Sequence, residues 1–312
     1  MITFWGELAV SDAHIHFFSH NFFASLAAQK QDPAFGAGGS AVEAVTRILG
    51  WQAPPPDPGD LAELWARELD RHGVSRAALI ASVPGDEPSV AAAVERFPER
   101  FYGYFMVNPL APDALARVEG ALTAGLRGVC LFPAMHRYSI TDPRVEPILQ
   151  AASIRTGTVI FVHCGVLTVG VRRKLGLASP FDMRCSNPID LHPIALLHPK
   201  LQFVVPHFGA GYLREALMLC DLCPNVCLDT SSSNSWVRYQ APELDLKTVF
   251  RRALDVAGPT RLLFGTDSSF FPRGWNAEIF AVQQKVLVDL GVGKDDAQAI
   301  LGGNLERLLR RG

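Results

Sequence analysis

The sequence predicts an α/β fold, namely a (β/α)₈ TIM barrel with an inserted cap segment after the first strand. Short β-rich apolar runs alternate with amphipathic or Ala/Leu-rich stretches along the 312 residues, and there are eight such runs. Runs such as FVVPHF and LLFGTD are continuously apolar, as expected for parallel strands that are covered on both faces. Successive runs that end at Ser82, Val107 and Phe132 are 25 residues apart. Eight βα units in a chain of this length favour a closed barrel over an open sheet.

The elements follow the chain in regular order. The predicted strands are residues 8–17, 76–82, 101–107, 127–132, 159–163, 201–207, 225–230 and 261–267. The helices predicted between and after them are residues 61–72, 87–97, 113–124, 144–155, 213–222, 246–257 and 276–290. Residues 295–311 predict one or two short helices that close the barrel.

Two stretches interrupt this rhythm. Residues 18–58 are far longer than an ordinary βα loop and contain short helical patterns near 22–29 and 42–49, followed by APPPDPGD. We expect this insertion to cap the catalytic face of the barrel. Residues 164–188, rich in Arg and turn formers, form the second long connection. Since no linker marks a boundary, we expect one domain over residues 1–312.

Composition excludes several classes of protein. The chain has 29 Lys+Arg against 31 Asp+Glu, a net charge of -2, which argues against a general nucleic-acid binding surface. The longest uncharged apolar stretch, residues 156–171, is too short to span a bilayer. The N-terminal residues lack the pattern of a secretory signal, and the six Cys are typical of reduced thiols. We therefore expect a cytoplasmic protein with no membrane or nucleic-acid partner.

Ionisable side chains gather at the carboxyl ends of the predicted strands. These are His14, His16, His163, His207 and Asp267. The carboxyl ends of parallel barrel strands meet at one rim, where active sites form. A single buried histidine is more often structural than a ligand, and an HxH pair alone is weak evidence. Because burying five such groups is costly unless they are satisfied, their convergence predicts a divalent metal site, with Zn²⁺ favoured over Mn²⁺, Fe²⁺ or Co²⁺.

The same residues lie in motifs that resemble the amidohydrolase superfamily, specifically the amidohydrolase-related (amidohydrolase family 2) group that includes aminocarboxymuconate semialdehyde decarboxylase and TIM-barrel lactone hydrolases. The motifs are DAHIHFF, FVHCG, VPHFGAG and FGTDSS, with further similarity in ELDRHGVSRAALIASVPGDE, FPERFYGYFMVNP, AGLRGVCLFP, PNVCLDTSSS and ILGGNLERLL. The resemblance runs nearly end to end, except over residues 18–58 and 164–188.

This resemblance implies that the metal ligands are His14, His16, His163 and Asp267. His207 would lie at or beyond the edge of the ligand shell and polarise water or a substrate oxygen. Asp267 would also act as general base. Many members of the superfamily hold two metals bridged by a carbamylated Lys on the fourth strand. That strand here contains GVCLFPAM and no Lys, which favours a mononuclear site.

Other residues have two interpretations each. Asp12 shares the inward face with His14 and either orients a ligand imidazole or is tied to backbone. Substrate binding is predicted for Arg137, Arg184, Trp236 and Arg273. Further candidates to bind a substrate carboxylate are Arg172, Arg173 and Arg238. Candidate pocket walls are Phe18, Trp51, Phe270, Phe271 and Trp275. Solvent exposure or ordinary packing is the alternative for each. Cys220, Cys223 and Cys227 are interpreted as buried thiols rather than a cluster site.

The leading functional hypothesis is a metal-dependent hydrolase in which one divalent ion activates water against the carbonyl carbon of a lactone, ester or amide of a small organic acid. The first alternative is a metal-dependent decarboxylase (a lyase) that acts without oxidation on an unsaturated or aromatic acid. The second is a metal-binding barrel without catalysis. A homodimer is compatible with the resemblance, and the expected partner is a small-molecule substrate.

Overall fold

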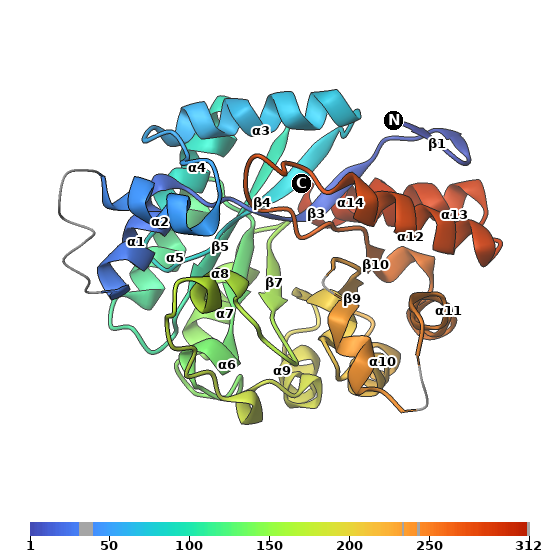
Figure 1. Ribbon diagram of the computed structural model, residues 1–312. Helices are drawn as coiled ribbons and strands as arrows, with labels where there is room; N and C mark the ends of the chain where they lie inside the picture. Colours follow the sequence, from blue (N-terminus) through green and yellow to red (C-terminus); the bar gives the residue numbers. More distant parts are fainter. Residues whose placement is uncertain (31–39, 233, 242–243, 311–312) are drawn as a thin grey trace.

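The computed structural model describes residues 1–30, 40–232, 234–241 and 244–310, and it confirms the predicted barrel. Eight parallel strands run in sequence order around the centre of the molecule (Figure 1). They are β3 (Ser11–His16), β4 (Arg76–Ala81), β5 (Phe101–Val107), β6 (Gly128–Leu131), β7 (Val159–Val162), β8 (Gln202–Val205), β9 (Val226–Asp229) and β10 (Leu262–Leu263). A two-stranded hairpin that the sequence analysis did not predict, β1 (Ile2–Thr3) and β2 (Gly6–Glu7), precedes them.

The two ends of the eight-stranded sheet meet where the segment after β10 lies against β3. We call this contact the seam. A parallel bridge joins Ile15 to Ser268. The backbone N–H groups of Ala13 and His16 donate to the carbonyls of Phe264 and Ser268 at 2.8 and 2.7 Å. The strands at the seam therefore meet through a few individual contacts rather than a continuous ladder.

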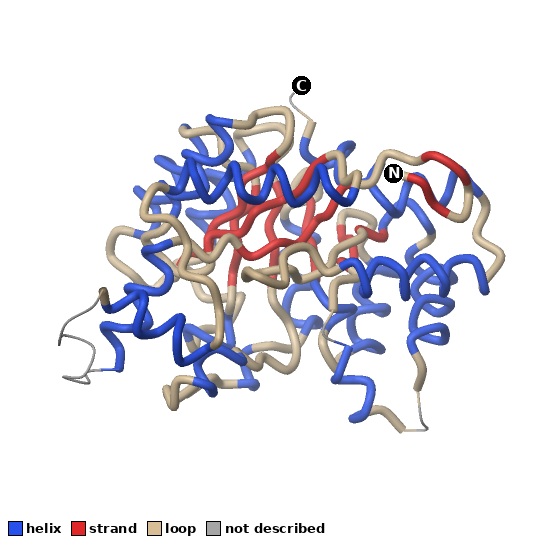
Figure 2. The backbone as a smooth tube through the Cα atoms, turned by 45° about the horizontal axis from the view of Figure 1, so that its top comes forward, coloured by secondary structure: helices blue, strands red, loops and turns tan. Residues whose placement is uncertain are grey.

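Helices surround the strands on the outside, as Figure 2 shows. They include α3 (Pro58–His72), α4 (Glu87–Arg96), α5 (Ala114–Thr123), α7 (Glu146–Ser153), α9 (His192–Leu197), α10 (Leu213–Leu222), α11 (Leu246–Ala257) and α12 (Ala277–Asp289). The chain then continues through α13 (Lys294–Gln298), the π-helical η7 (Ala299–Gly303) and α14 (Asn304–Leu309). Short helical turns occupy several loops: α6 (Pro133–His136), η2 (Met183–Cys185), η3 (Pro188–Leu191), η4 (Pro206–Gly209), η5 (Asn234–Tyr239) and η6 (Pro259–Arg261).

Side chains alternate between two buried layers, as expected for strands of period two. In β5, Tyr104 and Met106 point into the barrel lumen, whereas Phe105 and Val107 pack between the sheet and the helices. Both layers are apolar along most of the strands, except in β3, which carries Ser11, Asp12, His14 and His16. Polar side chains are thus confined to β3 and to the ends of the other strands, where the site lies.

Several predicted strands are too long at their carboxyl ends, for a physical reason. The predicted strand 201–207 ends at Val205, because Pro206 lacks an N–H and His207 adopts a left-handed φ of 55°. The predicted strand 261–267 shrinks to Leu262–Leu263, and Asp267 has a φ of 58°. In both cases the backbone has left the sheet before it reaches the polar residue, His207 or Asp267.

The two long connections pack together as a cap with its own core. The insertion 18–58 forms α1 (His20–Lys30) and α2 (Ala41–Leu49), close to the helices predicted at 22–29 and 42–49, while residues 31–39 of it lie outside the described residues. The second connection contributes α8 (Gly170–Lys174). Phe23 of α1, Val45 of α2 and Val171 of α8 share one apolar cluster, separate from the barrel core. The cap is therefore built jointly by the two segments that interrupt the βα rhythm.

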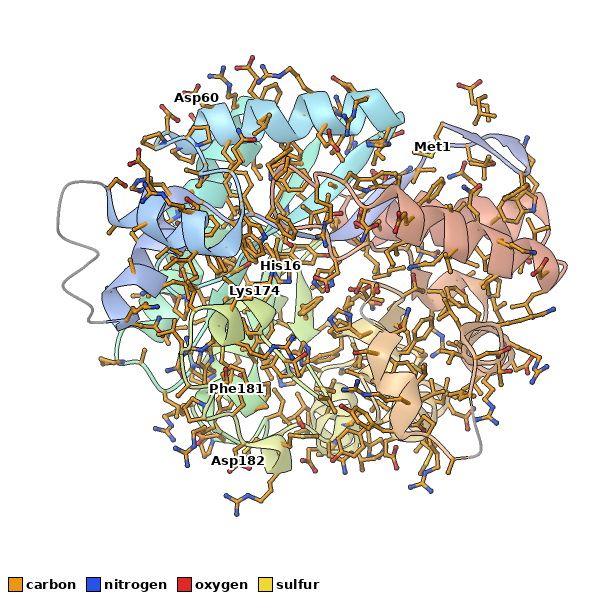
Figure 3. All side chains as sticks on the ribbon, in the orientation of Figure 1. Met1, His16, Asp60, Lys174, Phe181 and Asp182 are labelled. Atoms are coloured by element: carbon orange, nitrogen blue, oxygen red, sulfur yellow. The ribbon has the colours of Figure 1, made fainter. Side chains whose placement is uncertain are left out.

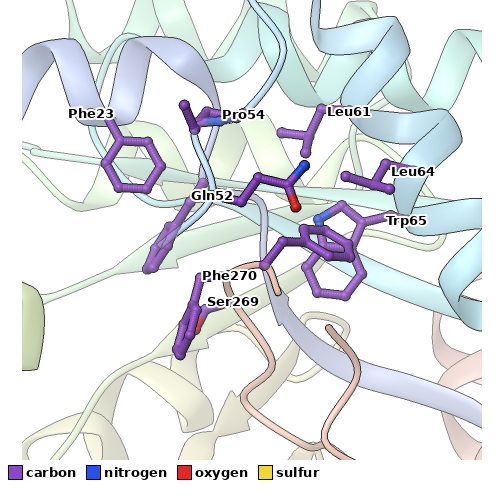
Figure 4. A pocket seen from close by; sticks show the side chains of 11 residues that line it. Phe23, Gln52, Pro54, Leu61, Leu64, Trp65, Ser269 and Phe270 are labelled. Carbon is purple, nitrogen blue, oxygen red and sulfur yellow. The ribbon is translucent and has the colours of Figure 1, made fainter. Parts of the chain in front are cut away.

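The cap also packs tightly onto the barrel rim. Figure 4 shows Phe23, Gln52 and Pro54 converging with Trp65 of α3 and Phe270 on a small hollow. That hollow is only about 10 Å³, too small for a ligand. The region between the cap and α3 is consequently a packed interface and not a binding site.

The helices and the cysteines of the structure can be compared with what the composition predicted. Within the described ranges, no helix combines the length and the hydrophobicity that crossing a membrane requires. Cys220, Cys223 and Cys227 are free and buried, and burial raises the pKa of the Cys220 and Cys227 thiols to about 12 and about 11. They are inert packing residues, as the sequence suggested.

Candidate metal centre

The site lies at the carboxyl end of the barrel, beside the seam. His14 and His16 are two residues apart on β3, so their side chains share the inward face. Asp267 follows β10, and its N–H donates to the carbonyl of His14 at 3.0 Å. Its left-handed backbone conformation turns the chain here, and such strain is typical of functional sites. Among the described residues, these three form the only group of His, Cys, Asp or Glu with ligand atoms close enough for one metal ion.

The spacing of the three ligand atoms fits a tetrahedral metal ion. The Nε2 atoms of His14 and His16 are 3.4 Å apart. The Oδ1 atom of Asp267 lies 3.7 Å from the first and 3.2 Å from the second. Ligands about 2.0–2.1 Å from a tetrahedral zinc ion are about 3.3 Å from one another. The donor set therefore matches such an ion in both chemistry and spacing.

The opposite nitrogen of each imidazole is already engaged. His14 Nδ1 lies 2.7 Å from Asp229 Oδ2, and His16 Nδ1 lies 2.7 Å from Ser82 Oγ. A proton on Nδ1 of His14 is donated to the carboxylate, which leaves Nε2 with a lone pair for a metal. Burial alone would lower the pKa of His14, but the charge of Asp229 raises it above its usual value. Asp229 thus fixes the tautomer and increases the basicity of this imidazole.

Asp267 is held as a carboxylate. The enclosure of the group would raise its pKa, but a hydrogen bond from His16 and the charges of His14 and His16 lower the pKa below the usual value. A carboxylate is the form that binds a cation and accepts a proton. The electrostatics around Asp267 therefore favour the deprotonated state that a metal ligand needs.

His207 occupies a strained turn next to His14. His207 and Phe208 both have left-handed backbone conformations, with φ of 55° and 52°. The His207 Nδ1 lies 3.1 Å from the carbonyl of Ser231 and 3.0 Å from its hydroxyl. Donation from Nδ1 to that carbonyl leaves Nε2 free to accept a proton. The ring centroids of His14 and His207 are 5.1 Å apart.

His163 follows β7 and stacks on Phe132, with ring centroids 5.4 Å apart. Its ring centroid is also 5.4 Å from that of His207. The Nδ1 atom is buried and has no hydrogen-bond partner among the residues that the structure describes. Burial and the neighbouring His207 and His14 lower its pKa well below the usual value, so the ring is a neutral base. His163 faces the same cavity as the three-residue group but does not belong to that group.

A cavity of about 570 Å³ opens onto these residues, a size suited to a small molecule. Figure 3 shows His16 near the middle of the molecule with Lys174 of α8 drawn beside it, and both line this cavity. Trp51 and Phe270 form a stacked pair with ring centroids 4.0 Å apart. Lys174 Nζ lies over the Trp51 ring, and the guanidinium of Arg273 lies over Phe270. The walls therefore combine aromatic faces with cations.

The substrate residues predicted from the sequence divide into two groups. Trp236 and Arg273 line the cavity, as do Arg173 and Arg238. Arg137 and Arg184 are exposed and do not line it. Arg184 pairs with Asp182 at 2.6 Å. Arg172 instead donates to Gln29 of the cap at 2.6 Å, and Phe271 and Trp275 are packing residues outside the cavity lining.

Three residues around the ligands escaped the sequence analysis: Asp229, Ser231 and Ser82. A signal for them existed. Ile80 and Cys227 point into the barrel lumen. Because every second residue of a strand shares a face, Ser82 lies on the inward face two residues after Ile80. Asp229 and Ser231 lie there two and four residues after Cys227. Polar residues on the inward face just beyond a strand are the natural hydrogen-bond partners of ligands on the neighbouring strands.

Asp12 had two open interpretations, and its contacts support the second. Its carboxylate accepts hydrogen bonds from the backbone N–H groups of His14 and Thr266, at 2.9 and 3.1 Å. No imidazole is among its hydrogen-bond partners in the described residues. Asp12 is therefore tied to backbone rather than to a ligand ring.

Comparison with known proteins identifies a family that spans almost the whole chain. A family model described as amidohydrolase matches residues 11–311. A curated relative, protein fluG of Emericella nidulans, is 35% identical over 107 residues, which are 33% of this chain and 12% of that protein. The chain thus corresponds to only a small part of that relative's length.

Solved structures share the fold at low sequence identity. An uncharacterised TIM-barrel protein of Bordetella bronchiseptica has a TM-score of 0.65 at 20% identity, covering 97% of this chain and 98% of the other. A probable 2-pyrone-4,6-dicarboxylic acid hydrolase of Acinetobacter baumannii, solved with citric acid, has a TM-score of 0.59 at 14% identity. The match covers 97% of this chain and 99% of the other. A Burkholderia multivorans amidohydrolase solved with zinc has a TM-score of 0.59 at 15% identity, and the match covers 96% of this chain and 99% of the other.

Proposed function

The chain belongs to the amidohydrolase family, and from that premise we propose that it is a hydrolase that uses one divalent metal ion and water to attack a carbonyl carbon. The proposed substrates are lactones, esters or amides of small organic acids. The proposed ligands are His14, His16, His163 and Asp267, and their chemistry suits Zn²⁺ best, with Mn²⁺, Fe²⁺ or Co²⁺ as alternatives. The observation that carries the proposal is the triangle of Nε2, Nε2 and Oδ1 atoms with sides of 3.2–3.7 Å.

The chain's own residues would divide the proton transfers between them. When bound, the ion would supply the positive charge that polarises a carbonyl and makes water reactive near neutral pH. Asp267, held as a carboxylate, can accept the proton of the attacking water. His207 can accept a proton at Nε2 and return it to the leaving group, because its Nδ1 is occupied by Ser231. Asp229 and Ser82 would hold the two ligand imidazoles in orientation.

Charge in the cavity favours an anionic substrate. Arg173, Lys174, Arg238 and Arg273 line it, whereas Asp267 is the only carboxylate that does so among the described residues. Within the described residues, Lys174 lies over the ring of Trp51. Arg273 lies over Phe270 and donates to the Ser269 hydroxyl and the Asp267 carbonyl, and the Asp267 charge acts on it. A substrate carboxylate would satisfy such cations. We assign substrate binding to Arg273 and Trp236, while roles for Arg137 and Arg184 remain predictions from the sequence.

One observation also favours decarboxylation as a second candidate. Arg273 Nη2 lies 3.4 Å from the carbonyl oxygen of Asp267, and its guanidinium covers Phe270. An Arg placed here would hold a substrate carboxylate next to the metal ligands and against an aromatic wall. That arrangement suits loss of CO₂ from an unsaturated or aromatic acid as well as it suits hydrolysis.

A metal-reconstitution assay tests the proposed function. Protein stripped with a chelator and reloaded with Zn²⁺, Mn²⁺ or Co²⁺ would be offered carboxylated lactones, esters and amides, and in parallel unsaturated and aromatic acids with CO₂ monitored. We expect hydrolysis that disappears on stripping and returns with metal. Release of CO₂ without hydrolysis would replace the first candidate by the second, and turnover by the stripped protein would contradict both.

Replacing Arg273 by Ala is expected to raise KM for a carboxylated substrate. A charge-assisted hydrogen bond contributes about 1.5–3 kcal/mol, so the increase should be roughly 10- to 100-fold. The matched control is Arg214→Ala, which removes an exposed Arg that pairs with Glu215 at 2.6 Å outside the cavity lining. Steady-state kinetics on the acid and on its uncharged methyl ester would show the loss for the acid alone. An equal loss in both variants, or none in Arg273→Ala, would rule out this role.

A further inference from the structure

We infer that Asp12 is a positioning residue that holds the metal ligands His14 and Asp267 in register across the seam of the barrel. The inference rests on the proposed metal site, but it concerns a residue that is not itself a ligand. Asp12 is completely buried, and it lies two residues before His14 on the same strand. Its action would pass entirely through the backbone of the ligand-bearing segments.

The hydrogen bonds of Asp12 join the two sides of the seam. Oδ1 accepts from the backbone N–H of His14 on β3, at 2.9 Å, and from the backbone N–H of Thr266 after β10, at 3.1 Å. Oδ2 accepts from the hydroxyl of Thr266 at 2.5 Å. Since Thr266 directly precedes Asp267, one carboxylate fixes the chain at one ligand and immediately beside another.

These bonds are needed because the strand ladder is weak at this point. The register between β3 and β4 shifts between Asp12 and Ile15. On the other side, β10 pairs with β9 through Leu262 and Leu263 only. The N–H groups of His14 and Thr266 are instead satisfied by Asp12. Because a buried N–H without a partner is costly, the carboxylate replaces the missing ladder bonds.

A further chain of contacts links Asp12 to helix α3. The indole N–H of Trp275 donates to Asp12 Oδ2 at 2.8 Å, and the backbone N–H of Trp275 donates to Glu68 Oε1 at 2.9 Å. Glu68 lies on α3 and is mostly buried. Trp275 therefore provides a way to weaken the Asp12 contacts without touching Asp12 or any ligand.

Asn cannot replace Asp12 without loss, although it has the same shape. Donors approach both carboxylate oxygens, and an amide offers only one oxygen. With the amide oxygen toward His14 and Thr266, the NH₂ group faces the indole N–H of Trp275. With the amide reversed, its NH₂ group faces the backbone N–H groups of His14 and Thr266. Either orientation forces a shift at the seam.

The test compares Co²⁺ affinity and the visible spectrum of bound Co²⁺ in Asp12→Asn, Trp275→Phe and the wild type. We expect the Kd for Co²⁺ to rise on the order of 10- to 100-fold in Asp12→Asn, as for other residues that orient metal ligands. A smaller rise is expected in Trp275→Phe, which also serves if Asp12→Asn does not fold. The visible spectrum of bound Co²⁺ should likewise change more in Asp12→Asn than in Trp275→Phe.

The matched control is Asn304→Ala. Asn304 is buried and donates to the carbonyls of Pro259 and Leu262, at 2.8 Å each, so it also anchors β10, but at the opposite end of the strand. Its loss should lower the melting temperature and leave the Co²⁺ affinity unchanged. Wild-type affinity in both Asp12→Asn and Trp275→Phe, or equal weakening in Asn304→Ala, would overturn the inference.

The same titration separates this inference from the proposed function. A ligand variant, His16→Ala, is included as a reference. If the wild type binds Co²⁺ tightly and His16→Ala does not, the metal site stands and the Asp12 result decides the inference alone. If His16→Ala binds Co²⁺ as the wild type does, the proposed site fails, and the inference about Asp12 fails with it.

Discussion

Replacing Asp267 by Asn is expected to lower kcat about 10²- to 10⁴-fold, the usual contribution of a positioned general base, and to weaken metal binding as well. The Oδ1 atom lies within 3.2–3.7 Å of both histidine Nε2 atoms, so the carboxylate would contribute charge to the ion and accept the proton of water. An amide of the same shape does neither. Metal content by elemental analysis and kcat on the substrate found by the reconstitution assay would measure the two losses.

A suitable control for this variant is Asp142→Asn. Asp142 pairs with Arg144 at 2.7 Å and does not line the cavity. It should retain both metal and turnover. Wild-type metal content together with wild-type kcat in Asp267→Asn would remove Asp267 from the mechanism.

The second large effect is expected at Asp229, a residue that touches neither the cavity nor the ion. Its Oδ2 contacts His14 Nδ1 at 2.7 Å, while its Oδ1 accepts from the N–H of Ser231 at 2.6 Å. In Asp229→Asn one of these donors must face an NH₂ group. If His14 responds by moving its proton to Nε2, that nitrogen can no longer bind metal, as in triads that lose their aspartate. We expect metal affinity to fall at least roughly 10- to 100-fold.

This variant can be distinguished from general damage by Asp86→Asn. Asp86 is also fully buried and accepts hydrogen bonds from Ser19 and Ser89, each at 2.6 Å, but it does not line the cavity. Both variants should melt at lower temperature, and Asp229→Asn alone should lose metal in a competition titration. Parallel loss in the two would show that Asp229 acts only through stability.

The sequence predicts the barrel well because the signal is repeated along the chain. Each strand is a run of apolar residues followed by a helical stretch, so eight weak signals support one topology. The histidines stand out for the same reason, since a polar group ending an apolar run is conspicuous. The strand ends were less predictable, because the turns at His207 and Asp267 depend on backbone conformations with positive φ, which side-chain patterns do not specify for residues other than glycine.

The remainder of the site depends on contacts between distant segments. Asp229 is 215 residues from His14 in the sequence, and only strand order brings them together. Arg273 and Trp236 line the cavity whereas Arg137 and Arg184 do not. All four lie in loops, where the sequence does not indicate which way a side chain points. The cap likewise requires knowing that two separate connections pack on each other.

The most direct measurement is the anomalous diffraction of a crystal of the zinc-loaded protein, recorded on both sides of the zinc absorption edge. We predict one peak in the barrel mouth, within ligand distance of His14 Nε2, His16 Nε2 and Asp267 Oδ1, with His163 as the fourth protein ligand. Protein that carries zinc in solution but shows the peak elsewhere, or bound by other residues, would contradict the account.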